Sequence, residues 1–517
     1  MKMVKNAIGR MVPVEIEGRP LRPFAGARAD HGGGRKIGPP IRSVVDYGNK
    51  LRASLDEAID ACAIKDGMTI SFHHHLRDGD YLVNMVVEKL AARGLRDLVF
   101  APSALFPVHE PLVGHTESGV LSHIVGSTNG PIGRACSLGK MKKVGVLRSH
   151  GGRYGAIQSG ELHVDVAFIA APTADSFGNA HGRSGPSACG PISFALADSL
   201  YADTVVVVTD NLQPFPVTPW VIKGGNVDHV CVVEKLGDPE KIVSGTTRIT
   251  RSPTRQLIAK FGAELVRDAG MLDRPGFSFQ AGAGGVSLAF VQYLGEIMRE
   301  KKVKAAFARG GSSEILCGLL DEGLIEYILD GQAFDTKGVK SLRENPRHLE
   351  TDPFTSYCYH TKGNFAPMVG VSILGATEID LDFNVNVNTH SDGWLLHGIG
   401  GFTDACDAEI TMITAPLVRG RLPIIVDKVT SVTAPGEMVD VIVTERGIAV
   451  NPRRRDLLDS LKGSRLPLRT IEELRDIAIK MTGVPRAPEF TDRIVALIEF
   501  RDGTIIDTVR QLVVRPK

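Results

Sequence analysis

A unit of strand, polar loop, helix and strand occurs twice in this chain, and the repeat constrains the fold more than any other feature. The first copy is "GMTISFHHHLRDGDYLVNMVVEKLAARGLRDLVFAPS" (67–103), and the second is "GFSFQAGAGGVSLAFVQYLGEIMREKKVKAAFARGGSSE" (276–314). Phe72 aligns with Phe279 and Ser103 with Ser312, an offset of about 207 residues. Strands that alternate with helices in this way predict parallel sheets of the α/β class.

A second pair of segments extends the repeat. "ELHVDVAFIAAPTADSFGNAHG" (161–182) matches "ATEIDLDFNVNVNTHSDGWLLHGIGG" (376–401), and a short apolar strand follows each segment. Two matches in the same order predict two tandem α/β domains, 46–268 and 269–517, with a boundary near 265–275. Chance similarity between two βαβ units is the alternative.

The ends of the chain follow different patterns. Residues 1–45 are rich in Gly, Pro and Arg without an apolar period, which predicts an irregular or partly disordered arm. Near the other end, two apolar runs joined at Asp502-Gly503 predict a C-terminal β-hairpin, and residues 440–450 predict another. We expect both hairpins to close the second domain.

Charge and cysteine usage exclude several classes of protein. With 60 basic and 59 acidic residues, the chain has no overall electrostatic footprint for nucleic acid or an anionic membrane. Seven scattered cysteines without a C-x-x-C pair indicate buried thiols in a reducing compartment, so a cytoplasmic location is expected. No signal peptide or membrane-spanning segment is predicted.

Three consecutive histidines, His73 to His75, follow the first strand of the first copy. They are not predicted to bind a metal ion, since neighbours in an extended chain point to opposite faces and no Cys, Asp or Glu lies at ligand spacing. Open parallel sheets bind ligands beyond the carboxyl ends of their strands. We therefore expect His73, His74, His75 and Arg77 to line an anion-binding cleft. Hydrogen bonding within a polar loop is an equally weighted alternative.

The glycine-rich loop "AGAGG" occupies the same place in the second copy. Gly282, Gly284 and Gly285 allow backbone N–H groups to approach an anion at a helix N-terminus. A dinucleotide fingerprint is a poor match, because Ser287 occupies its third glycine position and the next strand lacks the acidic residue that would hold a ribose. A tight turn without a ligand is the other alternative.

Two further loops carry candidate residues. Gly400 and Gly401, in "HGIGGFTDACDAE", suit an oxyanion or phosphate cradle. Glu314, in "GGSSEIL", is either a nucleophilic carboxylate for acyl transfer or an acid at a helix start. Spacing alone favours the helix start.

Several longer stretches resemble the alpha subunit of citrate lyase, within the wider CoA-transferase group. They include "DGMTISFHHHLRDGDYLVNMV", "SGELHVDVAFIAAPTAD", "GDPEKIVSGTTRIT", "GFSFQAGAGGVSLA" and "VDVIVTERGIAVNPRRRDL". The resemblance implies two tandem CoA-transferase-like domains of the phosphosugar-isomerase-like type. It implies a citrate CoA-transferase that exchanges citrate for acetate on an acyl-carrier-protein thioester.

The same resemblance implies partners and a cofactor. A beta subunit would cleave the citryl carrier, and a gamma subunit would carry a dephospho-CoA-derived prosthetic group, so that this chain holds no covalent cofactor and works in an oligomer. Direct attack of citrate on the thioester is the implied route. Gly282, Gly284 and Gly285 would stabilise the oxyanion, and the histidines and Arg77 would neutralise citrate carboxylates.

The sequence departs from that family around Ser313-Glu314, where it is more similar to CoA transferases that use a glutamate. A free-standing CoA transferase for another di- or tricarboxylic acid, with Glu314 as the nucleophile, is therefore an alternative. A non-catalytic sensor or assembly scaffold on the same fold is a second one.

Overall fold

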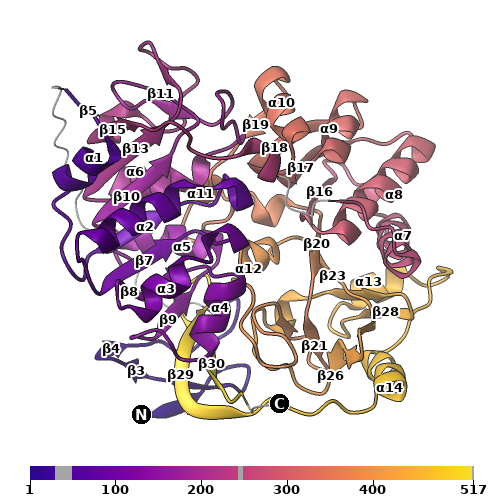
Figure 1. Cartoon of the computed structure of the whole chain (residues 1–517). Coiled ribbons are helices and arrows are strands. Elements are labelled where there is room, and N and C mark those ends of the chain that lie inside the picture. Colours follow the sequence, from indigo (N-terminus) through magenta and orange to yellow (C-terminus); the bar gives the residue numbers. More distant parts are fainter. Residues whose placement is uncertain (30–48, 243–247, 515–517) are drawn as a thin grey trace.

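The computed structural model describes residues 1–29, 49–242 and 248–514. Two α/β domains lie side by side, each with a parallel sheet between layers of helices (Figure 1). The first sheet contains β9 (Gly145–Leu147), β8 (Leu121–Gly126), β7 (Leu98–Pro102), β6 (Thr69–Phe72), β10 (Val166–Ala170), β13 (Thr204–Thr209), β15 (His229–Val232) and β5 (Leu51–Arg52), in that spatial order. The helices of this domain are α1 (Leu55–Ala61), α2 (Leu82–Ala92), α3 (Leu112–Glu117), α4 (Gly130–Ser137), α5 (His150–Ser159) and α6 (Leu196–Tyr201).

The second domain repeats the spatial order of the first seven of these strands but not of the eighth, because its own eighth strand runs antiparallel to its neighbour. Its sheet contains β19 (His348–Glu350), β18 (Ile325–Ala333), β17 (Ala305–Ser312), β16 (Ser278–Ala281), β20 (Val371–Gly375), β23 (Ile410–Thr414), β27 (Val441–Thr444) and β28 (Gly447–Val450). The helices are α7 (Pro253–Asp268), α8 (Gly285–Lys301), α9 (Glu314–Asp321), α10 (Thr336–Glu344), α11 (Pro353–Ser356), α12 (Phe402–Ala405), α13 (Arg455–Ser460) and α14 (Ile471–Thr482). The predicted tandem α/β architecture is confirmed.

Each domain also carries a small three-stranded sheet. These are β11 (Thr173–Asp175), β12 (Ala180–His181) and β14 (Leu212–Gln213) in the first domain, and β21 (Glu378–Asp380), β22 (Val385–Asn386) and β26 (Ile425–Val426) in the second. One aspartate forms the turn in each small sheet. In the first domain, Asp175 Oδ1 accepts hydrogen bonds from the backbone N–H groups of Phe177, Gly178 and Asn179. In the second domain, Asp380 Oδ1 accepts those of Asp382 and Asn384. The repeat therefore extends to side-chain hydrogen bonds.

Helix α7 precedes the predicted domain boundary but packs with the second domain. Its residues Ile258, Ala263 and Val266 belong to the same buried apolar cluster as Phe279 and Phe290. The second core therefore begins before residue 265, although the exact boundary stays a prediction.

The C-terminal hairpin, β29 (Phe490–Glu499) and β30 (Ile505–Leu512), is present but closes the first sheet instead of the second. Strand β29 runs parallel to β9, with Leu497 opposite Val146. The expectation that it closes the second domain is wrong, because its buried partner Arg148 lies next to β9 and sequence spacing cannot reveal that pair. The hairpin of β27 and β28 does lie at the edge of the second sheet.

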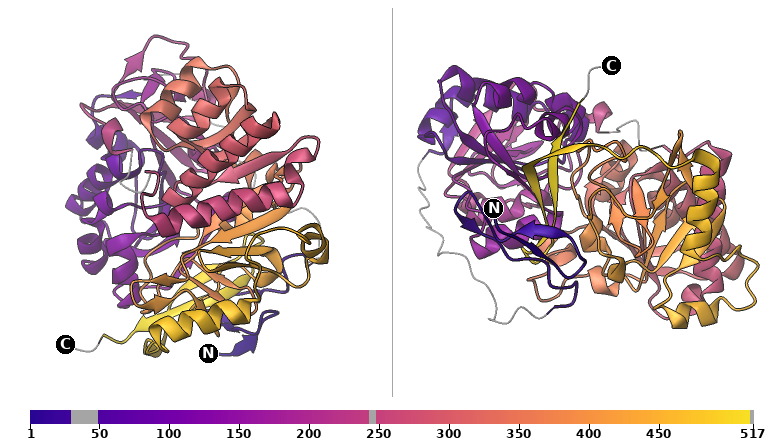
Figure 2. Two further views of the ribbon diagram at one scale, coloured as in Figure 1. Left: turned by 90° about the vertical axis from the view of Figure 1, so that its right-hand side faces the viewer. Right: turned by 90° about the horizontal axis from the view of Figure 1, so that it is seen from below.

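Residues 1–29 are ordered, in contrast to the predicted irregular arm. They form short antiparallel pairs and pack beside the hairpin (Figure 2). These are β1 (Met3–Lys5) with β2 (Met11–Pro13), and β3 (Glu15–Ile16) with β4 (Arg19–Pro20). Phe24 is buried edge-on against Phe500, and Asn6 Nδ2 donates to Ile506 O (2.7 Å). Residues 1–29 are therefore ordered by tertiary contacts, which the local sequence pattern does not reveal. The rest of the predicted arm, 30–45, lies outside the described residues.

We expect the Arg148–Glu499 ion pair to anchor the hairpin. Both side chains are buried, and the guanidinium makes two hydrogen bonds to the carboxylate (2.6 and 3.0 Å). Glu499→Ala should lower the free energy of unfolding by about 3–5 kcal/mol, since it leaves a buried cation without its partner. Urea unfolding measures this loss.

The matched control is Glu322→Ala, which breaks an equally bidentate but half-exposed pair with Arg299. It should change stability by about 0–1 kcal/mol. Equal effects of the two substitutions would contradict the anchoring role.

Candidate active site

The histidine loop follows β6, and all three of its histidines are buried. His73 Nε2 lies 2.9 Å from Asp198 Oδ2. The same carboxylate receives two hydrogen bonds from Arg153 and one from Ser71 Oγ. These charges hold the pKa of Asp198 well below its usual range despite complete burial. His73 is thus held within the core network of the first domain.

His74 and His75 point to different partners. His74 Nδ1 lies 2.6 Å from Ser103 Oγ, and its ring stacks on His150 with centroids 4.8 Å apart. His75 Nε2 donates to Ala170 O (2.7 Å). Burial lowers the pKa of His74 strongly and that of His75 to about 4, with neighbouring positive groups adding to the effect. Both rings are therefore neutral near pH 7.

Arg77 supplies a buried positive charge in this loop. Its backbone adopts φ +52°, and its guanidinium lies between the rings of Phe106 (5.5 Å) and Phe334 (5.1 Å). Burial lowers its pKa to about 10, which keeps it charged near neutrality. Because Phe334 belongs to the second domain and Gln332 Nε2 donates to His74 O (3.2 Å), the histidine loop lies at the domain junction.

The loop with Gly400 and Gly401 joins the same junction. Gly400 O accepts the His150 N–H (2.9 Å) at the start of α5, so this glycine presents a carbonyl to the first domain. Asp404 fixes the contact, since its carboxylate accepts Ser149 Oγ (2.7 Å) and Gly151 N (2.9 Å). The structure thus links Gly400 to His74 through His150.

Of the second group of predicted residues, Glu314 borders a cavity of about 940 Å³. Glu314 is the first residue of α9 with Ser313 as its N-cap, so the helix-start interpretation holds structurally. Its side chain is 72% exposed and contributes to the cavity wall. Gly284 is the N-cap of α8, and Gly285 O accepts the Thr250 N–H (3.2 Å) from a segment that also lines the cavity.

Sequence reasoning missed three groups at this site. Arg248 and Arg251 line the cavity, and the phenyl ring of Phe334 packs against Gly311 just before Ser313. The two arginines are visible in "TTRITRS", but only the tertiary structure brings them beside α8 and α9. Phe334 is the contact that connects Arg77 to the loop of Glu314.

A buried hub holds that loop in place. The carboxylate of Asp330, within β18, accepts hydrogen bonds from Ser312 Oγ (2.6 Å), Ser312 N (3.2 Å) and Gln332 N (2.9 Å), and His348 Nε2 lies 3.1 Å from it. The turn from β17 into α9 is therefore rigidly positioned.

One other cluster has metal-ligand character. Within the described part of the chain, only His163, Asp165 and Asp203 bring three possible ligand atoms within 4.8 Å of one another. They precede β10 and β13, at the opposite edge of the sheet from the histidine loop. No helix among the described residues is long and apolar enough to cross a membrane.

Solved structures of low sequence identity share this fold. The malonate decarboxylase alpha subunit from Acinetobacter baumannii is 14% identical with a TM-score of 0.61, covering 84% of this chain and 86% of that one. A 4-hydroxybutyrate CoA-transferase from Porphyromonas gingivalis is 16% identical with a TM-score of 0.53, covering 83% and 96%. Two such domains with facing loops at the strand ends define the CoA-transferase-like class of α/β proteins.

Closer relatives identify the family. The citrate lyase alpha subunit (CitF) family matches residues 48–512. The citrate lyase alpha chain of Klebsiella pneumoniae is 45% identical, covering 90% of this chain and 91% of its own. A solved alpha subunit of citrate lyase from Streptococcus mutans, in complex with citrate, is 42% identical with a TM-score of 0.94, covering 98% and 100%.

The chain therefore belongs to the citrate lyase alpha-subunit family. It is the acyl-transferase subunit of a multisubunit enzyme, as the resemblance predicted.

The domain junction also contains a carboxyl group that titrates near neutrality. Glu350 Oε1 accepts the Ile192 N–H (2.9 Å), and burial raises its pKa to about 7 from an ordinary value of 4.5. A raised pKa means that the folded protein binds this proton more tightly than the unfolded chain. Stability from this group is thus greatest below pH 4.5 and is lost as the pH rises towards 7.

Glu350→Gln keeps an acceptor for Ile192 but does not titrate. The stability of this variant relative to the wild type should therefore increase from pH 4.5 to 7, as measured by urea unfolding at several pH values. Exposed Glu326→Gln is the control. Parallel pH profiles for wild type and Glu350→Gln would contradict the assignment.

Proposed function

We propose that this chain exchanges citrate for acetate on the thioester of an acyl carrier, giving citryl carrier and free acetate. The beta subunit of citrate lyase then cleaves the citryl carrier, and the gamma subunit is the carrier. Family membership and the citrate complex of the Streptococcus mutans relative support this proposal.

The cavity beside Glu314 is the single observation that carries it. Arg248 and Arg251 border it, together with Leu288 of α8 and the first turn of α9. Guanidinium groups and a helix N-terminus favour phosphate groups. A dephospho-CoA-type prosthetic group on the carrier, or a CoA thioester, has the phosphates that this arrangement suits.

The chemistry requires positioning and oxyanion stabilisation. Attack of a citrate carboxylate on the acetyl thioester forms an oxyanion and then releases the thiolate, which attacks the citryl carbonyl of the mixed anhydride and displaces acetate. Gly284 and Gly285, at the start of α8, provide backbone N–H groups for the oxyanion. One such donor is worth about 2.7–4 kcal/mol, and positioning up to about 7–11 kcal/mol.

Citrate is assigned to the side of the histidine loop. Since His74 and His75 are neutral and His73 is paired with Asp198, Arg77 supplies the positive charge for the carboxylates. The neutral rings contribute hydrogen bonds, and Gly400 and Gly401 shape the junction next to them.

A covalent route through Glu314 is the second candidate. Its exposed carboxylate on the cavity wall favours this route. In that case the carboxylate attacks the acetyl thioester, the thiolate attacks the resulting anhydride, and a glutamyl thioester forms with release of acetate. The acid acceptor would then be citrate or another di- or tricarboxylic acid.

A cytoplasmic location is part of the proposal. The seven cysteines are all buried free thiols, which suits a reducing compartment.

Intact-protein mass after incubation with acetyl-CoA distinguishes the two routes. Borohydride reduces a glutamyl thioester, and hydroxylamine converts an acyl anhydride to a hydroxamate. If attack is direct, the wild type gains no adduct and Glu314→Gln still releases acetate in a citrate-dependent way. An adduct that disappears in Glu314→Gln but persists in Glu472→Gln, an exposed acid in the first turn of α14, would establish the covalent route.

Arg77→Lys tests the citrate side. Lysine keeps the charge but loses the planar guanidinium that lies between Phe106 and Phe334. We expect the citrate KM to rise about tenfold, roughly 1.4 kcal/mol, while the KM for acetyl-CoA stays the same. Steady-state kinetics measure both, and an unchanged citrate KM would remove Arg77 from the site.

A further inference from the structure

The two domains carry equivalent loops that meet different surroundings. The first-domain loop is "VTPWVI" (217–222), and the second-domain loop is "VTSVTA" (429–434). Asp175 Oδ2 accepts the Val217 N–H (2.9 Å) as Asp380 Oδ2 accepts the Val429 N–H (3.5 Å). The bridge of Ala180 with Ile222 matches that of Val385 with Ala434. Trp220 therefore occupies the position of Val432.

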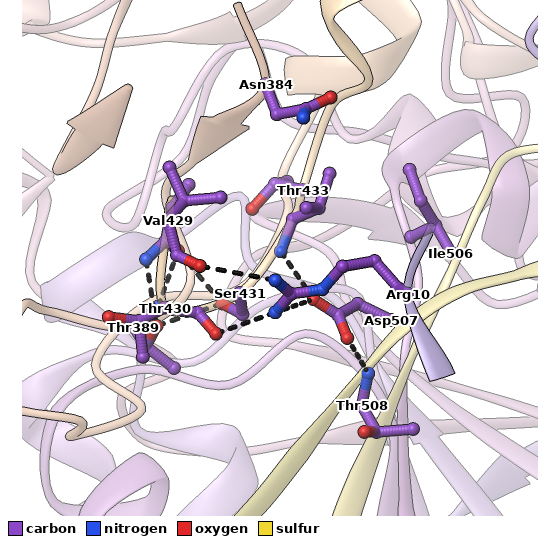
Figure 3. Close-up of polar contacts among 12 residues, drawn as sticks. Arg10, Asn384, Thr389, Val429, Thr430, Ser431, Thr433, Ile506, Asp507 and Thr508 are labelled. Carbon is purple, nitrogen blue, oxygen red and sulfur yellow. Dashed lines mark hydrogen bonds and ion pairs between the residues drawn. The ribbon is translucent and has the colours of Figure 1, made fainter. Parts of the chain in front are cut away.

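In the second domain this loop is covered by the two ends of the chain. Arg10 donates to Val429 O (3.4 Å) and Thr430 O (2.9 Å), and Asp507 of β30 pairs with Arg10 at 2.7 Å (Figure 3). Asp507 Oδ2 also accepts the Val432 N–H (2.8 Å). A two-stranded ribbon on the edge of one sheet thus binds the loop of the other domain through a carboxylate and backbone groups.

In the first domain, none of the described residues covers the equivalent surface in this way. Phe215 is 63% exposed and Trp220 45% exposed, and Leu212 is exposed beside them. Among the described residues, no acceptor is found for the backbone N–H of Trp220. Large aromatic side chains on a surface loop are typical of the centres of protein interfaces.

At the edge of the second sheet, no described strand pairs with the outer side of β19. Strand β19 corresponds to β9, but it is the last strand of its sheet, whereas β9 is followed by β29 and β30. Leu349 on β19 is exposed. Unpaired strand edges pair readily with a strand from another chain. Within residues 1–29, 49–242 and 248–514, the second half of the repeat thus has no counterpart of the ribbon beside β9.

We propose that a two-stranded β-ribbon from a different polypeptide adds to β19 and covers Leu212, Phe215 and Trp220. By analogy with Asp507, the ribbon presents a carboxylate to the backbone N–H of Trp220. The exposed Lys223, just after the loop, also favours a negative charge on the partner. A second copy of this chain does not supply the ribbon, because its own hairpin is held by the buried Arg148–Glu499 pair. The inference rests on the proposed function only in taking citrate lyase beta and gamma subunits as probes.

The test compares two double variants in binding to purified beta and gamma subunits. Phe215→Ser with Trp220→Ser should weaken binding of one subunit at least tenfold in biolayer interferometry. The control, Met481→Ser with Val484→Ser, removes two other exposed apolar side chains elsewhere on the surface and should bind as the wild type does. Citrate-dependent acetate release from acetyl-CoA by the chain alone should be unchanged in both.

Fluorescence gives an independent readout, since the chain has only two tryptophans. In a Trp394→Phe background, binding should shift the Trp220 emission to shorter wavelength, and hydrogen exchange should slow at Trp220 and in β19.

Unchanged affinity of both subunits for the Phe215/Trp220 variant would overturn the proposal. So would loss of self-association in that variant without the other subunits, which would assign the surface to a second copy. If the wild-type chain binds a subunit through this surface but transfers no acyl group, the proposed function is refuted and the docking proposal is supported.

Discussion

The geometry of the candidate active site depends on one buried contact, the Asp404 carboxylate at the start of α5. It accepts Ser149 Oγ and Gly151 N across the domain junction, where the orphan N–H groups of a helix favour negative charge. Burial nevertheless raises the pKa of Asp404 to about 6, while the hydrogen bonds from Gly151 and Ser149 act in the opposite direction and favour the charged form. Because this contact holds Gly400 against His150, it also fixes the ring on which His74 stacks.

The two halves of the site then have different electrostatic character. The histidine loop is buried, the rings of His74 and His75 are neutral, and Arg77 is held between aromatic rings from both domains. The cavity beside Glu314 is open and bordered by Arg248 and Arg251. An arrangement of this kind suits a reaction between a carboxylate substrate and a thioester that carries phosphates, because each ligand meets its own positive charge.

Internal duplication explains both the fold and its asymmetry. The parallel strands, the small sheets and the Asp175 and Asp380 turns recur in both domains. In the part of the chain that the structure describes, the hairpin and residues 1–29 occur only once, and they cover only one of the two equivalent loops. The remaining aromatic surface around Trp220 is a consequence of that single copy.

The α/β class, the tandem repeat, the C-terminal hairpin and the helix start at Glu314 were all predictable, because period, turn residues and caps are local signals. The placement of the hairpin beside β9 and the order of residues 1–29 were not, since both depend on partners hundreds of residues away, such as Glu499 for Arg148. The sequence by itself determined which loops follow the strands. Only the tertiary structure decided that His73 pairs with Asp198 while His74 lies at the domain junction. Burial and domain contacts are set by packing, and the sequence of three adjacent histidines gives no local signal about packing.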